Sequence, residues 1–210
     1  MTISPSEADV EPGATLGLTA TVQMEDPPPT LVFEWAVVSG PAMLNGLAEV
    51  EADVNTSGDG ATTHGVTFEA GLEPGDVFLT VEVYDGAGDA PVLVAEDDVT
   101  LTVKPFRVTI DPTSASLEAG EQLTLTGSIT PAPPEGERTF TWSVGTSEGL
   151  LDGQTSLEKV QPSGEQHSVV YQAVDEPTGC AKTVSLQVQI DTGSGTVTPA
   201  ETTATLRVGC

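Results

Sequence analysis

The chain has 210 residues, and its 32 acidic against 6 basic side chains give a net charge of −26 at pH 7. A field of this sign repels nucleic acid and anionic lipid, so we expect neither as a partner. No run approaches the ~18 apolar residues of a membrane-spanning helix, and Met1 leads straight into polar residues without a basic and apolar leader. The sequence therefore predicts neither membrane insertion nor a signal peptide.

Short stretches in which apolar and polar residues alternate, separated by Gly and Pro, predict antiparallel β-strands with one buried face. No segment shows a sustained helical period. The first strand is expected to kink at Pro5, and the fourth is the least regular. Seven short strands at about ten-residue spacing predict a two-sheet Greek-key sandwich. In the first half of the chain they lie near residues 2–10, 15–23, 31–38, 47–54, 63–70, 77–84 and 95–103.

The second half of the chain repeats the first. Ile3-Ser4-Pro5 returns as Ile110-Asp111-Pro112, and matched positions continue at an offset of 107, without a gap, to Trp35 and Trp142. A repeat of this kind predicts two copies of one fold. Loops tolerate small changes in length, and after such changes the copies match again. His64 matches His167 at an offset of 103, and we align Leu79, Val81 and Val83 with Leu186, Val188 and Ile190 at 107.

The two predicted domains are residues 1–104 and 105–210. The first carries 19 acids and one base, and the second carries 13 acids and five bases. Their junction, Lys104-Pro105-Phe106, contains no Gly/Ser tract that would form a long flexible tether. Pro105 ends the preceding strand, and we expect Phe106 to pack between the domains and make the link stiff.

The aromatic residues mark the predicted cores. Phe78 and Tyr84 are out of phase with the apolar positions of their strand, so we expect them to point away from the core. They are about 20 Å apart along one strand, which is too far for a single sugar platform, and no small-molecule ligand is expected. Six of the nine aromatics instead form matched pairs at core positions: Phe33 with Phe140, Trp35 with Trp142, and Phe68 with Tyr171.

The two cysteines are predicted to form a disulfide. Cys180 precedes the strand that is expected to pair with the last strand of the chain, which ends at Cys210. In an antiparallel hairpin the start of one strand lies beside the end of the next, which brings the two residues to disulfide distance. Such a bond would indicate an oxidising compartment. The alternative is two free thiols.

No residue pattern indicates a catalytic site. His64 and His167 occupy matching positions in separate domains, so they cannot form one nucleophile–base site, and we interpret them as strand residues rather than as ligands. No glycine-rich phosphate loop and no His/Cys spacing of a metal site occurs in the sequence. We therefore expect neither an enzyme nor a cofactor.

One group of acids could bind calcium, which takes six to eight oxygen ligands. Asp85, Asp89, Glu96, Asp97 and Asp98 lie in or beside one connection of the first domain. Their spacing matches no fixed calcium-loop motif, and acids are abundant throughout the chain. We therefore favour a solvated acidic loop over a calcium site.

The order of these features resembles that of bacterial immunoglobulin-like repeats: Ser-Pro, a Gly before the second strand, Trp in the third, an aromatic in the fifth, and Val-rich last strands. The first copy, with Trp35-Ala36-Val37-Val38-Ser39-Gly40-Pro41 and Val83-Tyr84-Asp85-Gly86, is also similar to the PKD-type (polycystic-kidney-disease) repeat. The second copy lacks this Gly-Pro. The resemblance implies an all-β chain of two tandem immunoglobulin-like Greek-key β-sandwiches, in a stalk, spacer or adhesive module on the bacterial cell surface or in a secreted protein.

We therefore expect a non-catalytic structural, spacer or interaction module of a larger bacterial extracellular protein. Cys210 ends the chain just as a predicted strand finishes, so we expect a mature piece or an excised fragment. Its partners would be other domains of that protein or protein ligands. Three alternatives stay open: an adhesin segment that binds a ligand, a subunit of an extracellular filament or virion, and an accessory domain of a hydrolase. The loops are small, Gly-rich and acidic, whereas an adhesive tip would need aromatics.

Overall fold

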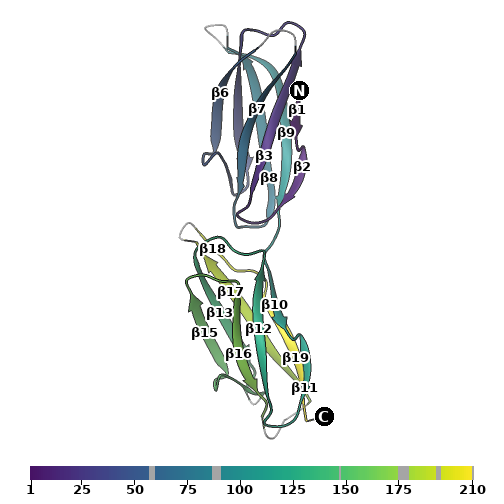
Figure 1. The fold of residues 1–210 in the computed structure, drawn as a ribbon, viewed down its shortest axis with the longest axis vertical. Helices are drawn as coiled ribbons and strands as arrows, with labels where there is room; N and C mark the ends of the chain where they lie inside the picture. Colours follow the sequence, from purple (N-terminus) through teal and green to yellow (C-terminus); the bar gives the residue numbers. More distant parts are fainter. Residues whose placement is uncertain (57–59, 87–90, 147, 175–179, 193–194, 210) are drawn as a thin grey trace. The chain divides into compact units, whose positions relative to one another are not determined.

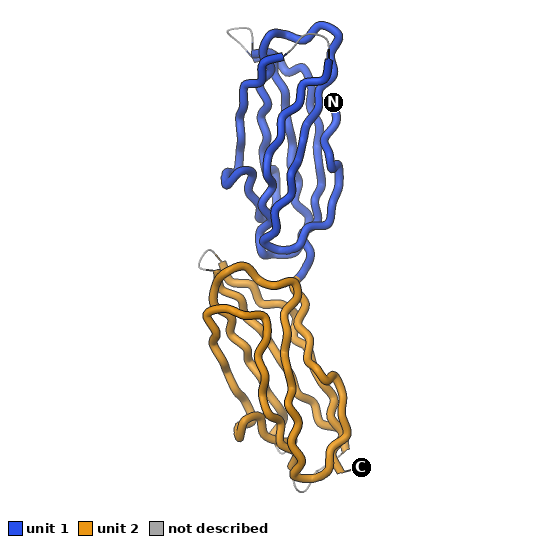
Figure 2. Tube along the Cα trace, in the orientation of Figure 1, with its two compact units in different colours: residues 1–105 blue, residues 106–210 orange. Residues whose placement is uncertain are grey.

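The computed structural model describes residues 1–56, 60–86, 91–146, 148–174, 180–192 and 195–209, and all regular secondary structure in them is β-strand. The chain divides into two compact units, Met1–Pro105 and Phe106–Cys210 (Figure 2). Each unit consists of two packed sheets, which confirms the predicted all-β fold of two immunoglobulin-like sandwiches.

The first unit starts at β1 and ends with β9 (Figure 1). Its strands are β1 (Thr2–Ser4), β2 (Glu7–Val10), β3 (Thr15–Met24), β4 (Thr30–Ser39), β5 (Ala42–Leu44), β6 (Glu49–Asn55), β7 (Gly60–Ala70), β8 (Gly75–Asp85) and β9 (Val92–Val103). One sheet has the order β1-β3-β7-β5 and the other β2-β9-β8-β4-β6. Neighbouring strands are antiparallel, except that β2 and β9 are parallel.

The second unit repeats this order with β10-β12-β16-β14 in one sheet and β11-β19-β17-β13-β15 in the other, while β18 pairs with β17. Its strands are β10 (Arg107–Asp111), β11 (Ser114–Leu117), β12 (Gln122–Thr130), β13 (Glu137–Val144), β14 (Leu150–Leu151), β15 (Ser156–Gln161), β16 (Gln166–Gln172), β17 (Ala181–Asp191), β18 (Thr196–Val197) and β19 (Thr202–Val208). Here β11 and β19 are the parallel pair.

The first predicted strand of each copy is two strands in different sheets. In the first unit β1 pairs with β3, and after Pro5 the chain crosses to the other sheet, where β2 pairs with β9. Pro112 marks the same crossing in the second unit, and both prolines follow a cis peptide bond. The expected kink at Pro5 is thus a change of sheet.

The least regular predicted strand, residues 47–54, corresponds to β6. β6 begins at Glu49 and pairs with β4, in the sheet opposite β7. The short β5 pairs with β7 instead. The alternating residues of β6 allow it to lie at the edge of either sheet, so the sequence pattern alone could not assign it.

The alignment of β8 with β17 at an offset of 107 is wrong. Trp35 is opposite Val81, and Trp142 is opposite Leu186, so equivalent positions of these two strands differ by 105. A shift of two residues keeps every side chain on the same face. Both offsets therefore fit the apolar alternation equally well, and only the strand register distinguishes them.

The two cores lie between the sheets of each unit. In β3 the alternation buries Leu18, Ala20 and Val22 and turns the threonines between them to the outer face. Phe106 is also buried, with 5% of its surface exposed. All six aromatics predicted for the cores have at most 1% of their surface exposed: Phe33, Phe140, Trp35, Trp142, Phe68 and Tyr171.

Two buried charged residues of the second unit, Arg138 and Lys182, have no charged counterpart in the first unit. Arg138 stands where the first copy has Leu31, and only 2% of its surface is exposed. Its guanidinium donates to the carbonyl of Pro133 at 2.8 Å and to the carbonyls of Pro134 and Gly136. These bonds satisfy most of the buried donors and hold the connection between β12 and β13 against the end of the core.

Trp35→Ala is expected to cost the first unit about 3–5 kcal/mol of unfolding free energy, because removing a buried aromatic leaves a cavity. Trp142 is then the remaining tryptophan and reports on the second unit alone. We expect circular dichroism to show early loss of part of the β signal while Trp142 fluorescence changes at the wild-type temperature. A variant that melts like the wild type by both probes would contradict this placement of Trp35.

Candidate functional site

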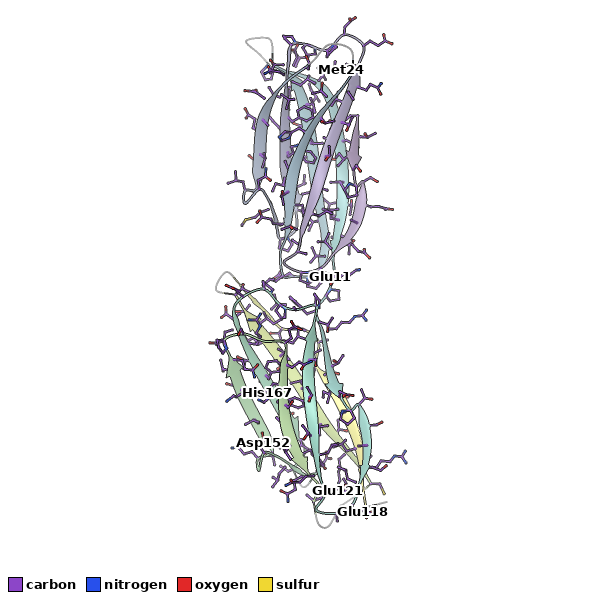
Figure 3. All side chains as sticks on the ribbon, in the orientation of Figure 1. Glu11, Met24, Glu118, Glu121, Asp152 and His167 are labelled. Atoms are coloured by element: carbon purple, nitrogen blue, oxygen red, sulfur yellow. The ribbon has the colours of Figure 1, made fainter. Side chains whose placement is uncertain are left out.

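The two histidines connect the two sheets of their own unit. Trp35 of β4 donates its indole N–H to Nδ1 of His64 on β7, with a nitrogen–nitrogen distance of 3.1 Å. Trp142 of β13 makes the same bond to Nδ1 of His167 on β16 at 3.0 Å (Figure 3 labels His167). In each unit the donor lies in one sheet and the acceptor in the other.

Ring packing accompanies this bond. The centroids of Phe33 and His64 are 5.6 Å apart with the rings tilted by 39°, and those of Phe140 and His167 are 5.6 Å apart with a tilt of 36°. Burial lowers the pKa of His64. The pKa of His167 is also lowered, chiefly by burial and further by the charge of Lys159, while Asp152 acts in the opposite direction.

The histidines are therefore structural acceptors, a role that sequence reasoning missed. The sequence separations are 29 residues for Trp35 and His64 but 25 for Trp142 and His167, so no fixed spacing exists to reveal the pair. The usable signal was that both Trp and both His occupy matching places in the repeat.

Of the five acids considered for a calcium site, the three on β9 do not all turn to one face. Asp89 lies outside the described residues. Glu96 and Asp98 turn to the outer face of β9, and Asp97 turns to the other face because side chains alternate along a strand. Within the described ranges, no group of three or more His, Cys, Asp or Glu residues is placed to hold a metal ion. Calcium binding stays a question for experiment.

A row of four glutamates crosses the outer face of the larger sheet of the first unit, one on each of four neighbouring strands. Glu51 of β6 is opposite Glu34 of β4, Glu34 is opposite Glu82 of β8, and Glu82 is opposite Glu96 of β9. Directly opposite residues have Cβ atoms about 4.5–5.5 Å apart, and like charges at this distance repel. We call these four residues the glutamate row.

Tyr84 reports the combined field of this row. Its hydroxyl donates to a carboxylate oxygen of Glu82 at 2.5 Å. This hydrogen bond, followed by burial and the charges of Glu82, Glu34 and Glu96, raises the pKa of Tyr84 to about 12. Tyr84 thus lies on the outer face as predicted, and so does Phe78, of which 47% is exposed.

In the second unit the two middle positions of the corresponding row are neutral, while the two outer positions hold Glu158 and, at the offset of 105 between β9 and β19, Glu201. Glu158 of β15 is opposite Thr141 of β13, and Thr141 is opposite Gln187 of β17. One of these three residues is charged, compared with all three in the first unit. The glutamate row is therefore a property of the first unit rather than of the shared fold.

The predicted disulfide lies partly outside the described residues, because Cys210 is not among them. Cys180 precedes β17, and its carbonyl accepts the N–H of Val208 at 2.9 Å. The start of β17 and the end of β19 are therefore neighbours, as the hairpin argument requires. The disulfide itself stays a prediction.

No protein-family model and no curated protein sequence matches the chain. Among solved structures it is similar to the C-terminal domain of the Streptococcus pyogenes antigen I/II-family protein AspA, with 9% identity over 95% of this chain and 94% of that chain and a TM-score of 0.41. The C-terminal domain of the Streptococcus agalactiae antigen I/II polypeptide BspA matches with 10% identity over 95% and 94% of the two chains and a TM-score of 0.42.

E. coli alpha-2-macroglobulin matches with 12% identity over 97% of this chain and 16% of that chain and a TM-score of 0.36. The residues that the structure describes include no helix of the length and hydropathy needed to span a membrane.

Glu34→Thr is expected to stabilise the first unit by about 1 kcal/mol or less at low salt, because Glu34 faces an acid on both sides and its removal abolishes two repulsive pairs. The gain should disappear between about 0.01 M and about 1 M salt, over which the Debye length falls from ~30 Å to ~3 Å. The melting of the first unit can be followed by the indole N–H resonance of Trp35.

Glu158→Thr is the matched control, since Glu158 faces Thr141 and should give no salt-dependent gain. Melts in calcium chloride and in sodium chloride of equal ionic strength separate calcium binding from general screening. A Glu34→Thr variant that is less stable than wild type at low salt would refute the repulsion argument.

The disulfide predicts that the unreduced protein has no reactive thiol and that reduction exposes two. Cys180→Ser should lower the unfolding free energy of the second unit by about 3–4 kcal/mol, because the open chain gains entropy when unfolded. The first unit should melt unchanged. Two reactive thiols in protein kept from reductant would rule out the disulfide.

Proposed function

We propose that the chain is a non-catalytic spacer of a larger bacterial surface or secreted protein, in which immunoglobulin-like and PKD-type domains hold other parts apart. The observation that carries the proposal is that the chain enters and leaves each sandwich towards opposite ends. Termini at opposite ends of a unit allow tandem copies to add length to a protein.

The strand register shows at which end of each unit the chain enters and at which end it leaves. In the first unit, Thr2 is opposite Thr21, towards the end of β3, whereas the last residue of β9, Val103, is opposite Gly75 and Val10. The second unit has the same arrangement, with Arg107 opposite Thr130 and Val208 opposite Leu117. Each copy would add roughly 35 Å, the length of an 11-residue strand such as β8.

The terminal strands suit a chain under tension. β2 and β9 are parallel neighbours, with Ala8 opposite Leu101 and Val10 opposite Val103. Force that pulls the two termini apart draws β2 and β9 in opposite directions along their length. All hydrogen bonds between them are then loaded together instead of one after another. β11 and β19 form the same parallel pair in the second unit.

The polar residues that a catalytic role would use serve the fold. His64 and His167 accept hydrogen bonds from buried tryptophans, and Arg138 is bound to backbone carbonyls. The glutamate row gives the first unit a strongly negative outer face, which favours solubility and disfavours close packing against other acidic surfaces. These features support a spacer role outside the cell.

Single-molecule stretching of the full chain, held at its two ends, tests the proposal. We expect two unfolding events at forces typical of sheared strands. Ala8→Pro removes one backbone N–H from β2 and should lower the unfolding force of the first unit, while the second unit serves as the internal control. Equal forces for wild type and Ala8→Pro would refute a load-bearing role for β2 and β9.

The same traces report on the cysteines. With the disulfide closed, unfolding of the second unit should release about 30 residues less than after reduction, a difference of ~100 Å at about 3.6 Å per residue. Equal extensions with and without reductant would refute the disulfide and leave the spacer proposal untouched.

A further inference from the structure

The hydrogen bond between Trp and His can form only when the histidine is neutral. An indole N–H donates and cannot accept, so Nδ1 of His64 and of His167 must carry a lone pair and the ring proton must sit on Nε2. Protonation of the imidazole adds the second proton to Nδ1, the atom that receives the indole. The charged histidine and the hydrogen bond therefore exclude each other.

Loss of the acceptor leaves a buried donor. Trp35 has 1% of its surface exposed and Trp142 has none. Buried polar groups are destabilising when no partner remains, and these indoles lie between the sheets, away from bulk water. Partial burial of the imidazole also disfavours its charged form, because burial removes water that would solvate the charge. Both effects penalise the protonated folded state.

We propose that each unit contains an acid-sensitive latch, Trp35–His64 in the first and Trp142–His167 in the second, which holds the two sheets together at neutral pH and is released in mild acid. The two latches have the same geometry, so both units respond in the same direction. This inference does not depend on the spacer role.

Near the first latch, Asp97 of β9 turns to the inner face, opposite Val81, which is itself opposite Trp35. Burial is nevertheless the cause that lowers the pKa of His64. β3 and β5 carry no titratable residue. The acids of β4 and β6 (Glu34, Glu49, Glu51 and Asp53) are opposite one another or opposite outward residues, on the outer face of their sheet. On β7 itself, Glu69 is five residues from His64 and has the opposite parity, so it faces outward.

The second latch has charged neighbours. Lys159 of β15 is opposite Phe140 and therefore turns towards the inner face, where its charge opposes protonation of His167. Asp152, which follows β14 and accepts the N–H of Val170 at 2.9 Å, favours protonation. Glu158 of β15 and Glu137 of β13 turn outward, and β12 and β16 carry no acid or other base. Arg138 of β13 is held by carbonyls of the connection between β12 and β13.

The direction of the pH effect follows from linkage. The pKa of both histidines is lowered in the folded protein, so below the ordinary value of about 6.5 the unfolded state binds more protons than the folded state. Stability is fully present above that value, falls as the pH drops through it, and stops falling below the folded pKa. Carboxylates titrate mainly near pH ~4, so the range from about pH 8 to about pH 5 isolates the histidines.

The chain has two tryptophans and two histidines, which makes the latch directly observable by NMR. Between about pH 8 and about pH 5, we expect both indole N–H resonances to shift and to lose protection from hydrogen exchange, and both units to melt at a lower temperature. The same spectra give the pKa of each histidine from its ring protons.

His64→Asn and His167→Asn test the assignment. An asparagine amide oxygen is as far along the side chain as Nδ1, so it can accept the indole N–H without titrating. His64→Asn should remove the pH response of the Trp35 resonance and leave that of Trp142, and His167→Asn should do the reverse. Each variant thus contains its own control.

Three results would overturn the proposal. Indole resonances that do not change between about pH 8 and about pH 5 would show that no latch opens. A His64→Asn protein that keeps the full pH response at Trp35 would assign the response to other groups. If a variant does not fold, the wild-type titration alone decides, because a histidine pKa at or above about 6.5 in both units contradicts the latch.

Discussion

Both sandwiches share one directional contact between their sheets, the hydrogen bond from a buried tryptophan in one sheet to a histidine in the other. Packing of apolar side chains drives two sheets together but does not by itself fix how they are placed along each other, since the hydrophobic effect is non-directional. A hydrogen bond between Nε1 of Trp35 and Nδ1 of His64 is directional and allows one placement. The phenylalanine two residues before each tryptophan then packs on the same histidine.

The sequence pattern predicted the interior well, because buried positions of a strand are apolar and alternate with polar ones. Strand alternation placed Phe33, Trp35 and Phe68 in the first core and their counterparts in the second, and the structure buries all of them. The same reasoning could not find features that depend on register. The glutamate row forms only when four strands are paired, which brings together Glu51, Glu34, Glu82 and Glu96. Neither the order nor the spacing of these residues in the chain predicts that they are neighbours.

Period-two alternation also explains the wrong alignment of the two copies and why the sheet of β6 could not be predicted. An offset of 105 or 107 between β8 and β17 puts the same residues in the core, so apolar pattern could not choose between them. Likewise β6 has one half-buried face and can complete either sheet. It lies beside β4 because Val50 and Ala52 are there opposite Trp35 and Phe33, next to the largest side chains of the core.

The inner and outer faces of the two units have diverged to very different extents. Most equivalent inner positions hold apolar or aromatic side chains in both units, and both keep the histidine that accepts the tryptophan N–H. Arg138, which replaces Leu31, is an exception. Equivalent outer positions hold Glu34 and Glu82 in one unit and Thr141 and Gln187 in the other. Glutamate is a poor strand residue, and opposed glutamates repel. A sandwich with a directional bond and a filled core can tolerate such a row. The charge of the outer face can therefore differ between domains that have similar cores.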